Sequence, residues 1–215
     1  MHNALEELSS TMAYVGGATV SLYRDRPAAD ARFTQDVDLV VELATYRDFA
    51  DLEDSLRKKG FVNDIGSGVL CRYTIGSITV DFMPTRGDVL GFSNPWYPSG
   101  FAHSITYRID ETTDIRIFDA PHFLATKLAA FHSRGRGDGR TSSDFEDIVY
   151  VMKNRHSIWD EMSRAPMPVR NFLQTSFAEL LEIRHVFEWF SVHMDPYERQ
   201  MADSIITGLS RFCNQ

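Results

Sequence analysis

Cysteine is scarce in this chain of 215 residues, and long apolar runs are absent. The two cysteines, Cys71 and Cys213, lie far apart and match no CxxC spacing, which argues against both a disulfide framework and a zinc site. No apolar run approaches the roughly 18 to 20 residues that span a bilayer, and the N-terminal MHNALEELSS has no apolar core behind a basic segment. We therefore expect a soluble, unexported protein of the reducing cytoplasm.

An excess of positive charge is also missing. The formal net charge is -8 and the isoelectric point is near 5.3, which argues against broad nonspecific binding to nucleic acid through phosphate neutralisation. One local exception is RGRGDGR, residues 134–140, where arginines alternate with glycines. This segment reads either as a solvated loop or as a loop that contacts a nucleotide or RNA phosphate, and the sequence leaves both open.

Internal repeats and low-complexity tracts are lacking too, and an apolar content of 43% suits one folding unit with two halves. We expect an α+β fold, with a small mixed sheet flanked by helices over residues 1–119 and a helical region packed on it over residues 120–215. The expected elements of the first half are helices at 3–10, 18–25 and 45–60, strands at 12–15 and 36–43, a hairpin at 69–84, a strand pair at 105–119, and loops at 26–33 and 85–104.

Two aspartates, Asp36 and Asp38, interrupt the apolar run DVDLVVEL, although strands disfavour aspartate and a buried unpaired carboxylate is costly. On a strand, residues i and i+2 face the same side, so these carboxylates point together while Val37 and Leu39 point to the other face. Two adjacent anions repel unless a cation lies between them. Mg²⁺ fits, because it takes hard carboxylate oxygens and keeps coordination positions for substrate phosphates; Mn²⁺ is the alternative ion.

A third acid and a glycine pair extend this pattern. Asp81 lies in the second arm of the expected hairpin, and it would complete a two-ion site for phosphoryl transfer if that arm pairs beside the Asp36 strand. Gly16 and Gly17 stand between a strand pattern and a helix pattern, where backbone N–H groups can meet a triphosphate. Each motif alone is weak, but their order along the chain favours a metal-dependent nucleotide site.

The glycine pair, the segment RFTQDVDLV and the aspartate of TVDFMP together resemble the polymerase-β-type nucleotidyltransferase superfamily. They are most similar to its AbiEii-like minimal members, which include toxins of toxin-antitoxin pairs. The resemblance covers roughly residues 13–150 and implies a nucleotidyltransferase sheet, an NTP substrate and Mg²⁺ bound by three catalytic aspartates, Asp36, Asp38 and Asp81. The nucleotide-binding residues that it implies are Gly16, Gly17, Thr19, Arg32 and Thr34.

Two later helix patterns match the same family, through Lys127 in LATKLAAF and through Asp144 and Asp147 in SSDFEDIVYVM. Lys127 reads either as a ligand of the triphosphate or as a lysine whose ammonium reaches solvent. Asp144 is also an acid of the kind favoured at the start of a helix. Asp147 could orient Lys127 or act as a base towards the acceptor hydroxyl, so we count Lys127 and Asp147 among the expected catalytic residues. Ala18 departs from the family pattern, which has a hydroxyl residue there.

Aromatic residues give weaker signals. Trp96 and Tyr97 stand in a loop-like segment after the metal strand, where they could cover a nucleobase. The run FEWF, residues 187–190, reads more simply as helical core than as a base-stacking platform.

These patterns together predict a Mg-dependent nucleotidyltransferase that moves an NMP from an NTP to an acceptor hydroxyl. The family resemblance favours a toxin that acts on RNA, such as tRNA, or on a protein, with an antitoxin protein as its partner. Two alternatives stay open: a small-molecule (antibiotic) adenylyltransferase, and a noncatalytic binding module of the same fold. The nucleotide and the oligomeric state are not predicted.

Overall fold

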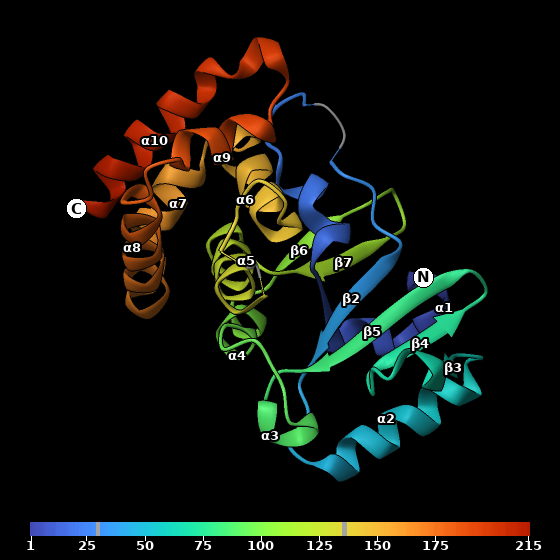
Figure 1. Ribbon diagram of the computed structural model, residues 1–215. Coiled ribbons are helices and arrows are strands. Elements are labelled where there is room, and N and C mark those ends of the chain that lie inside the picture. The colour runs from blue at the N-terminus through green and yellow to red at the C-terminus, as the bar shows by residue number, and fades with distance from the viewer. Residues whose placement is uncertain (29–30, 135–136) are drawn as a thin grey trace. The chain divides into compact units, whose positions relative to one another are not determined.

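The computed structural model describes residues 1–28, 31–134 and 137–215, which form two compact units (Figure 1). Unit 1 comprises residues 1–19 and 32–119, and unit 2 comprises residues 20–31 and 120–215. Part of the expected loop at 26–33 and part of RGRGDGR lie outside the described residues. The chain is thus a mixed α+β protein, as the sequence predicts at this coarse level.

The described residues of unit 1 build one mixed sheet of seven strands, in the order β3-β4-β5-β2-β1-β7-β6. The central strands β2 and β5 run parallel, as do β1 and β7, while the other neighbouring pairs are antiparallel. The strands are β1 (Met12–Val15), β2 (Asp36–Val41), β3 (Val62–Asn63), β4 (Arg72–Ile75), β5 (Ile78–Pro84), β6 (Ile105–Arg108) and β7 (Asp114–Ile117). The expected hairpin is present, with β4 and β5 joined by a two-residue turn.

Helical segments of unit 1 are short, except for α2 (Tyr46–Lys58). Thr45 caps α2 with a reciprocal capping box to Asp48, and the chain turns away at Gly60, whose φ is +88°. The helix predicted over 45–60 is therefore confirmed. The other segments are α1 (His2–Leu5), the 3₁₀ helices η1 (Glu6–Thr11) and η3 (Ile65–Ser67), α3 (Gly87–Leu90) and α4 (Tyr97–Ala102).

The two faces of the sheet differ in what they bury. On one face Ala13, Val15 and Val40 cluster with Phe118, and Tyr97 and Phe101 of α4 pack against this cluster. On the opposite face the ring of Phe82 meets the edges of Phe61 and Tyr73. Because Val15 pairs directly with Asp38 across β1 and β2, the aspartate shares the face that α4 covers. Apolar packing thus ends where the acidic positions begin.

Unit 2 is helical from Ala120 onward, as the sequence predicts. Its helices are α5 (Ala120–Arg134), α6 (Ser143–Asn154), α7 (Ile158–Arg164), α8 (Met167–Leu181), α9 (Val186–Val192), the 3₁₀ helix η4 (Pro196–Glu198) and α10 (Gln200–Cys213). Within this unit α5 packs against both α6 and α8, and α10 packs against α8 (Figure 1). None of the helices in the described ranges is long and apolar enough to cross a membrane.

Local structure differs from the sequence-based expectation at several places. The single helix expected at 3–10 is divided into the short helix α1 and the 3₁₀ helix η1. The helix expected at 18–25 is the 3₁₀ helix η2 (Gly17–Tyr23), and the loop expected at 85–104 contains α3 and α4. Residues 20–31, expected in the first half, group with unit 2. Residues 20–31 group with unit 2 because of tertiary contacts. The ring of Tyr23 lies 4.3 Å from that of Phe123, and Arg155 donates a hydrogen bond to the Tyr23 carbonyl over 2.8 Å. Local patterning carries no trace of such long-range partners.

Candidate active site

Three carboxylates stand on one face of two neighbouring parallel strands in unit 1. In the β2–β5 register Asp38 pairs directly with Asp81, and Asp36 pairs with Thr79. Adjacent strands lie about 4.8 Å apart, and residues i and i+2 share a face, so the three acids form a compact anionic group. The Asp81 side chain is 11% exposed, whereas the Asp36 side chain is 43% exposed. The strand of Asp81 therefore pairs beside the strand of Asp36 and Asp38, which is the condition that the sequence analysis set for a three-acid site.

The glycine pair follows β1 and lies against this group. Gly16 has φ +71°, and a Cβ added to it would lie 1.9 Å from Oδ2 of Asp38. A Cβ added to Gly17 would lie 2.4 Å from Nη2 of Arg32. Any side chain at either position would therefore displace a charged group, because a Cβ atom essentially never lies within 3.0 Å of a non-bonded heavy atom. The glycines let the backbone approach one carboxylate and one guanidinium closely.

Two hydroxyl groups that the sequence singles out have different roles. Thr34 donates to Oδ1 of Asp36 over 2.6 Å, which fixes the orientation of that carboxylate. Thr19 is 2% exposed, and its hydroxyl donates to the Gly16 carbonyl over 3.0 Å. Thr19 thus closes the turn after the glycine pair in the described conformation, and a direct contact to phosphate stays a prediction.

Sequence reasoning missed Arg72, which lies on β4 directly opposite Asp81. Its Nε and Nη2 donate to the two oxygens of Asp81 over 2.8 and 2.7 Å, and Nη2 lies 4.0 Å from Oδ2 of Asp36. The hydrogen bonds to Asp81 raise the pKa of Arg72 above its usual range. Counting outward from the Gly76-Ser77 turn places Arg72 opposite Asp81, so the hairpin register held the signal that could have found it.

The donor chemistry of the three acids suits a hard divalent cation, with one obstacle. Carboxylate oxygens are the ligands that Mg²⁺ prefers, and Asp36 keeps a partly exposed side chain. Both oxygens of Asp81, however, accept hydrogen bonds from Arg72. Within the described ranges, no group of three or more His, Cys, Asp or Glu side chains stands ready to hold a metal ion. The described conformation thus offers in Asp36, Asp38 and Asp81 donors of suitable chemistry, but not a formed metal site.

Cys71 precedes Arg72, but its chemistry makes it a poor nucleophile. The residue is 1% exposed, and burial together with the nearby Asp81 carboxylate raises the pKa of its thiol to about 12. The thiolate is the reactive form, and this environment suppresses it at neutral pH.

Lys127 of unit 2 lies between two buried carboxylates. Its Nζ is 2.6 Å from Oδ2 of Asp147 and 3.3 Å from Oδ1 of Asp144, with all three side chains at most 7% exposed. The alternative of a lysine reaching solvent is therefore wrong for the described conformation. The structure brings Lys127 and Asp147 together, as expected for an acid that orients the lysine.

Asp144 has a second cationic partner. Arg134, at the end of α5, donates to its two oxygens over 2.9 and 3.1 Å. Burial raises the pKa of Asp144, but the hydrogen bonds from Arg134 and the charge of Lys127 outweigh it, so the net shift is downward. Ser142 rather than Asp144 caps α6, accepting from the Phe145 amide over 3.3 Å. Asp144 thus belongs to an ion-pair network that spans α5 and α6.

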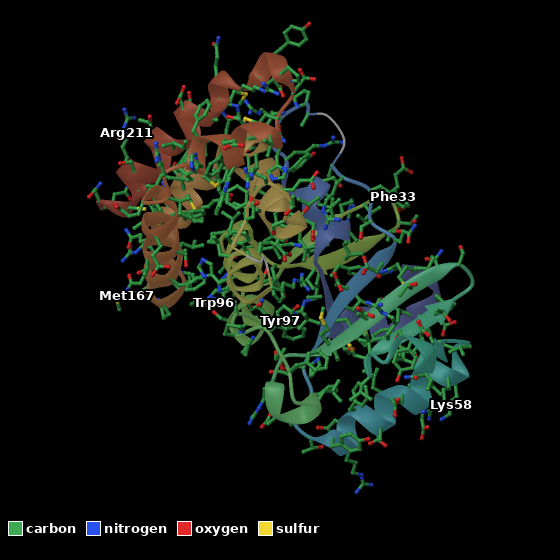
Figure 2. The ribbon with its side chains drawn as sticks, in the orientation of Figure 1. Phe33, Lys58, Trp96, Tyr97, Met167 and Arg211 are labelled. Atoms are coloured by element: carbon green, nitrogen blue, oxygen red, sulfur yellow. The ribbon has the colours of Figure 1, made fainter. Side chains whose placement is uncertain are left out.

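The remaining basic and aromatic candidates have mostly structural contacts. In the described part of RGRGDGR, Arg140 pairs with Asp138 and with Glu188. Trp96 and Tyr97 lie at the start of α4 (Figure 2), where the Tyr97 ring meets that of Phe118 and its hydroxyl donates to the sulfur of Met83. Of the FEWF run, Trp189 and Phe190 are buried and Phe187 is 44% exposed, which fits the core interpretation for the first two.

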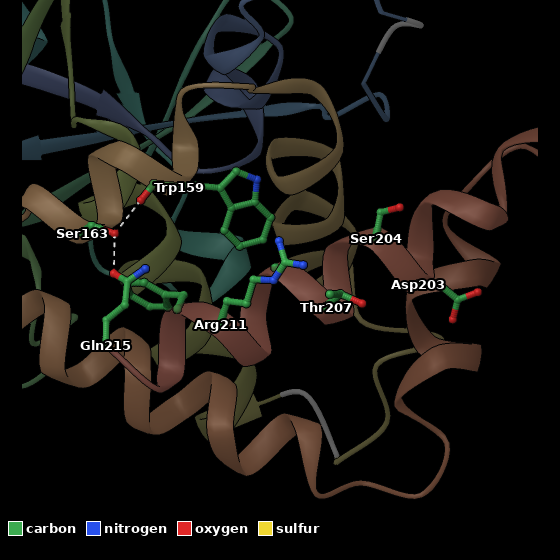
Figure 3. A pocket seen from close by; sticks show the side chains of 9 residues that line it. Trp159, Ser163, Asp203, Ser204, Thr207, Arg211 and Gln215 are labelled. Atoms are coloured by element: carbon green, nitrogen blue, oxygen red, sulfur yellow. Dashed lines mark hydrogen bonds between the residues drawn. The ribbon is translucent and has the colours of Figure 1, made fainter.

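A cavity of about 540 Å³ in unit 2 was not anticipated from the sequence (Figure 3). It is lined by α7 and α10, with Trp159, Arg211 and Phe212 among its walls. The Trp159 ring packs so tightly on Gly208 that a Cβ there would lie 2.5 Å away. Figure 3 also shows the Ser163 hydroxyl donating a hydrogen bond to the side-chain oxygen of Gln215 at one end of the cavity. None of the sequence-predicted site residues lines this cavity.

No protein-family model matches the chain, and no curated protein matches it at a significant level.

Proposed function

We propose that the chain is a metal-dependent nucleotidyltransferase of the polymerase-β type, transferring an NMP from an NTP to an acceptor hydroxyl. The observation that carries this proposal is the register of β2 and β5, which pairs Asp38 with Asp81 and leaves Asp36 two positions away on the same face. A backbone turn at Gly16 approaches this group without a side chain between them. A purely structural sheet gains nothing from three clustered anions.

The proposed chemistry assigns a task to each residue of unit 1. Asp36 and Asp38 would hold Mg²⁺, which would neutralise the triphosphate and keep it in line for attack. The Gly16-Gly17 backbone, with Arg32 over Gly17 and the neighbouring Thr19 and Thr34, would bind the phosphates.

In the transfer step the acceptor oxygen forms a bond to the α-phosphorus, and the bond from that phosphorus to pyrophosphate breaks. The hydroxyl proton passes to the Asp81 carboxylate. Positioning and charge stabilisation supply most of the rate in such reactions. Lys127 and Asp147 stay predicted contributors by resemblance alone, because their described contacts are those of a buried ion-pair network.

The acceptor is proposed from the same resemblance. A toxin that modifies RNA, such as a tRNA end, or a protein is the favoured form, and an antitoxin protein would then be its partner. Its acid triad would be equally suited to a small-molecule acceptor, so the acceptor must be found by experiment.

The test incubates the purified protein with Mg²⁺ and each of the four α-labelled NTPs, against total cellular RNA, cell protein and an aminoglycoside. We expect label in one acceptor class with one nucleotide, and its loss in Asp38→Asn and Asp81→Asn. The matched control is Asp114→Asn, since Asp114 also forms a cross-strand pair with an arginine, Arg108, but lies exposed on β7. Full activity in Asp81→Asn would refute the assignment of the base.

A noncatalytic binding module is the second candidate, and the Arg72–Asp81 pair is the observation that favours it, because an acid held by an arginine needs no metal. This candidate predicts no label in any acceptor and no shift of the melting temperature with NTP and Mg²⁺. Label dependent on Asp38 would exclude it.

A further inference from the structure

Arg72 lies close to two of the three acids. Its guanidinium grips Asp81 through two hydrogen bonds of 2.8 and 2.7 Å and comes within 4.0 Å of Asp36. The bidentate geometry uses both carboxylate oxygens of Asp81, the atoms that a divalent ion would need. An ion that approaches those oxygens also meets the positive charge of the guanidinium, so the two cations compete for Asp81.

The pair also lies where the electrostatic need is greatest. Asp38 and Asp81 are direct neighbours across the strands. By Coulomb's law, two like charges about 4 to 5 Å apart repel by roughly 3 to 4 kcal/mol at an effective dielectric constant of about 20. A cation between the acids removes much of this repulsion. The Arg72 side chain is 27% exposed and the Asp36 side chain 43%, so Arg72 has both an alternative partner and an open path to solvent.

We propose that Arg72 is an internal counter-cation, which holds Asp81 in the metal-free protein and gives it up when a divalent ion binds. This inference rests on the proposed function, because it presumes that the acids bind a metal. It names Arg72 as a positioning residue: the side chain keeps the acids together before the ion arrives and sets how tightly the ion binds.

Two opposite effects of Arg72→Gln follow. The metal-free protein loses a cation among three anions, so its melting temperature in EDTA falls. The divalent ion loses a competitor and a nearby positive charge, so its affinity rises by about tenfold or more. Arg72→Lys keeps the charge but not the bidentate hydrogen bonds. Its melting temperature and its affinity for the ion should therefore lie between those of the unaltered protein and Arg72→Gln. A merely structural arginine would show only the first effect.

The experiment measures Mn²⁺ binding to the full chain by the loss of the free-ion electron paramagnetic resonance signal, and melting temperatures with EDTA and with Mn²⁺. The variants are Arg72→Gln, Arg72→Lys and the control Arg108→Gln. Arg108 forms the same bidentate cross-strand pair with Asp114, at 2.8 and 2.9 Å, but on β6 and β7, away from the acids. Arg108→Gln should leave Mn²⁺ affinity unchanged.

Tighter Mn²⁺ binding in Arg72→Gln, with Arg72→Lys intermediate, supports the proposal. Equal or weaker binding in both variants, while the unaltered protein binds Mn²⁺, overturns it and leaves the proposed function standing. An absence of Mn²⁺ binding in the unaltered protein and in Arg72→Lys alike overturns the proposed metal-dependent function itself. If Arg72→Gln fails to fold, by circular dichroism, Arg72→Lys alone decides between these outcomes.

Discussion

Replacing Gly16 by alanine separates the conformational cost of a left-handed residue from the cost of crowding the acidic site. The φ of +71° disfavours alanine by about 1 to 2 kcal/mol. The added Cβ would also stand 1.9 Å from Oδ2 of Asp38, so that oxygen must retreat by about 1.1 Å to reach the 3.0 Å limit of real contacts. A misplacement of about 1 Å in a catalytic group can cost about a hundredfold in rate.

Gly68 provides the matched control. Its φ of +70° is nearly identical, and an added Cβ there meets nothing within 4 Å. Gly68→Ala should therefore lose a similar amount of stability for the conformation alone, with Mn²⁺ binding and nucleotidyl transfer unchanged. Gly16→Ala should lose at least the same stability and, in addition, about a hundredfold in transfer rate together with a measurable loss of Mn²⁺ affinity.

The assay pairs thermal unfolding with Mn²⁺ titration and, once an acceptor is known, single-turnover transfer. Because the two variants share the backbone cost, any difference between them reports the displacement of Asp38. If Gly16→Ala and Gly68→Ala behave alike in metal binding and in transfer, the reasoning that Asp38 belongs to the site is refuted.

Three further outcomes follow from the ion pairs and thiols. Lys127→Met should lower the free energy of unfolding by about 3 to 5 kcal/mol, measured in urea, because it leaves buried acids uncompensated, and adding Asp147→Asn should recover part of that loss. Asp25 accepts from the backbone amides before α7, and these bonds outweigh its desolvation, lowering its pKa to about 2. Its contribution is therefore present above about pH 4 and lost as the pH falls towards 2, so Asp25→Asn should flatten the acid limb of stability by about 1 kcal/mol after screening, in urea titrations from pH 2 to 6. Native-state labelling by a thiol reagent at pH 8 should modify Cys213 well before Cys71, and equal rates would contradict the burial of Cys71.

Sequence patterns predicted the elements that are determined locally. The run DVDLVVEL contains β2 because its valines and leucines suit a buried strand. Thr45 and Gly60 delimit α2 because caps act within one turn. Residues 85–104 look like a loop from their glycines and prolines, yet they contain α4, since Tyr97 and Phe101 gain packing on the sheet that composition alone does not show.

The acids of the candidate site could be located from the sequence, but their partners could not. The i and i+2 spacing places Asp36 and Asp38 on one face of any strand, whereas the pairing of Asp38 with Asp81 depends on strand order. Arg72 escaped notice because an arginine in a strand has many ordinary roles, and only the hairpin register reveals its partner. Lys127 reads from the sequence as a phosphate ligand or a lysine that reaches solvent, but its carboxylate partners come from α6, which no spacing rule connects to it.

The two acid clusters differ in what it takes to open them. Lys127 and its acids are almost wholly buried, so removing the cation would strand carboxylates in a low dielectric, and the pair is expected to persist through any ligand exchange. Arg72 is partly exposed and has Asp36 within 4.0 Å, so its hydrogen bonds to Asp81 can be replaced by bonds to Asp36 or to water with a small loss of free energy. An acid that must meet a metal and then a proton needs a partner that can leave. On these grounds Asp81, rather than Asp147, is the better choice for the catalytic base. Asp147→Asn should lower the free energy of unfolding, while the protein that remains folded should keep most of its transfer rate.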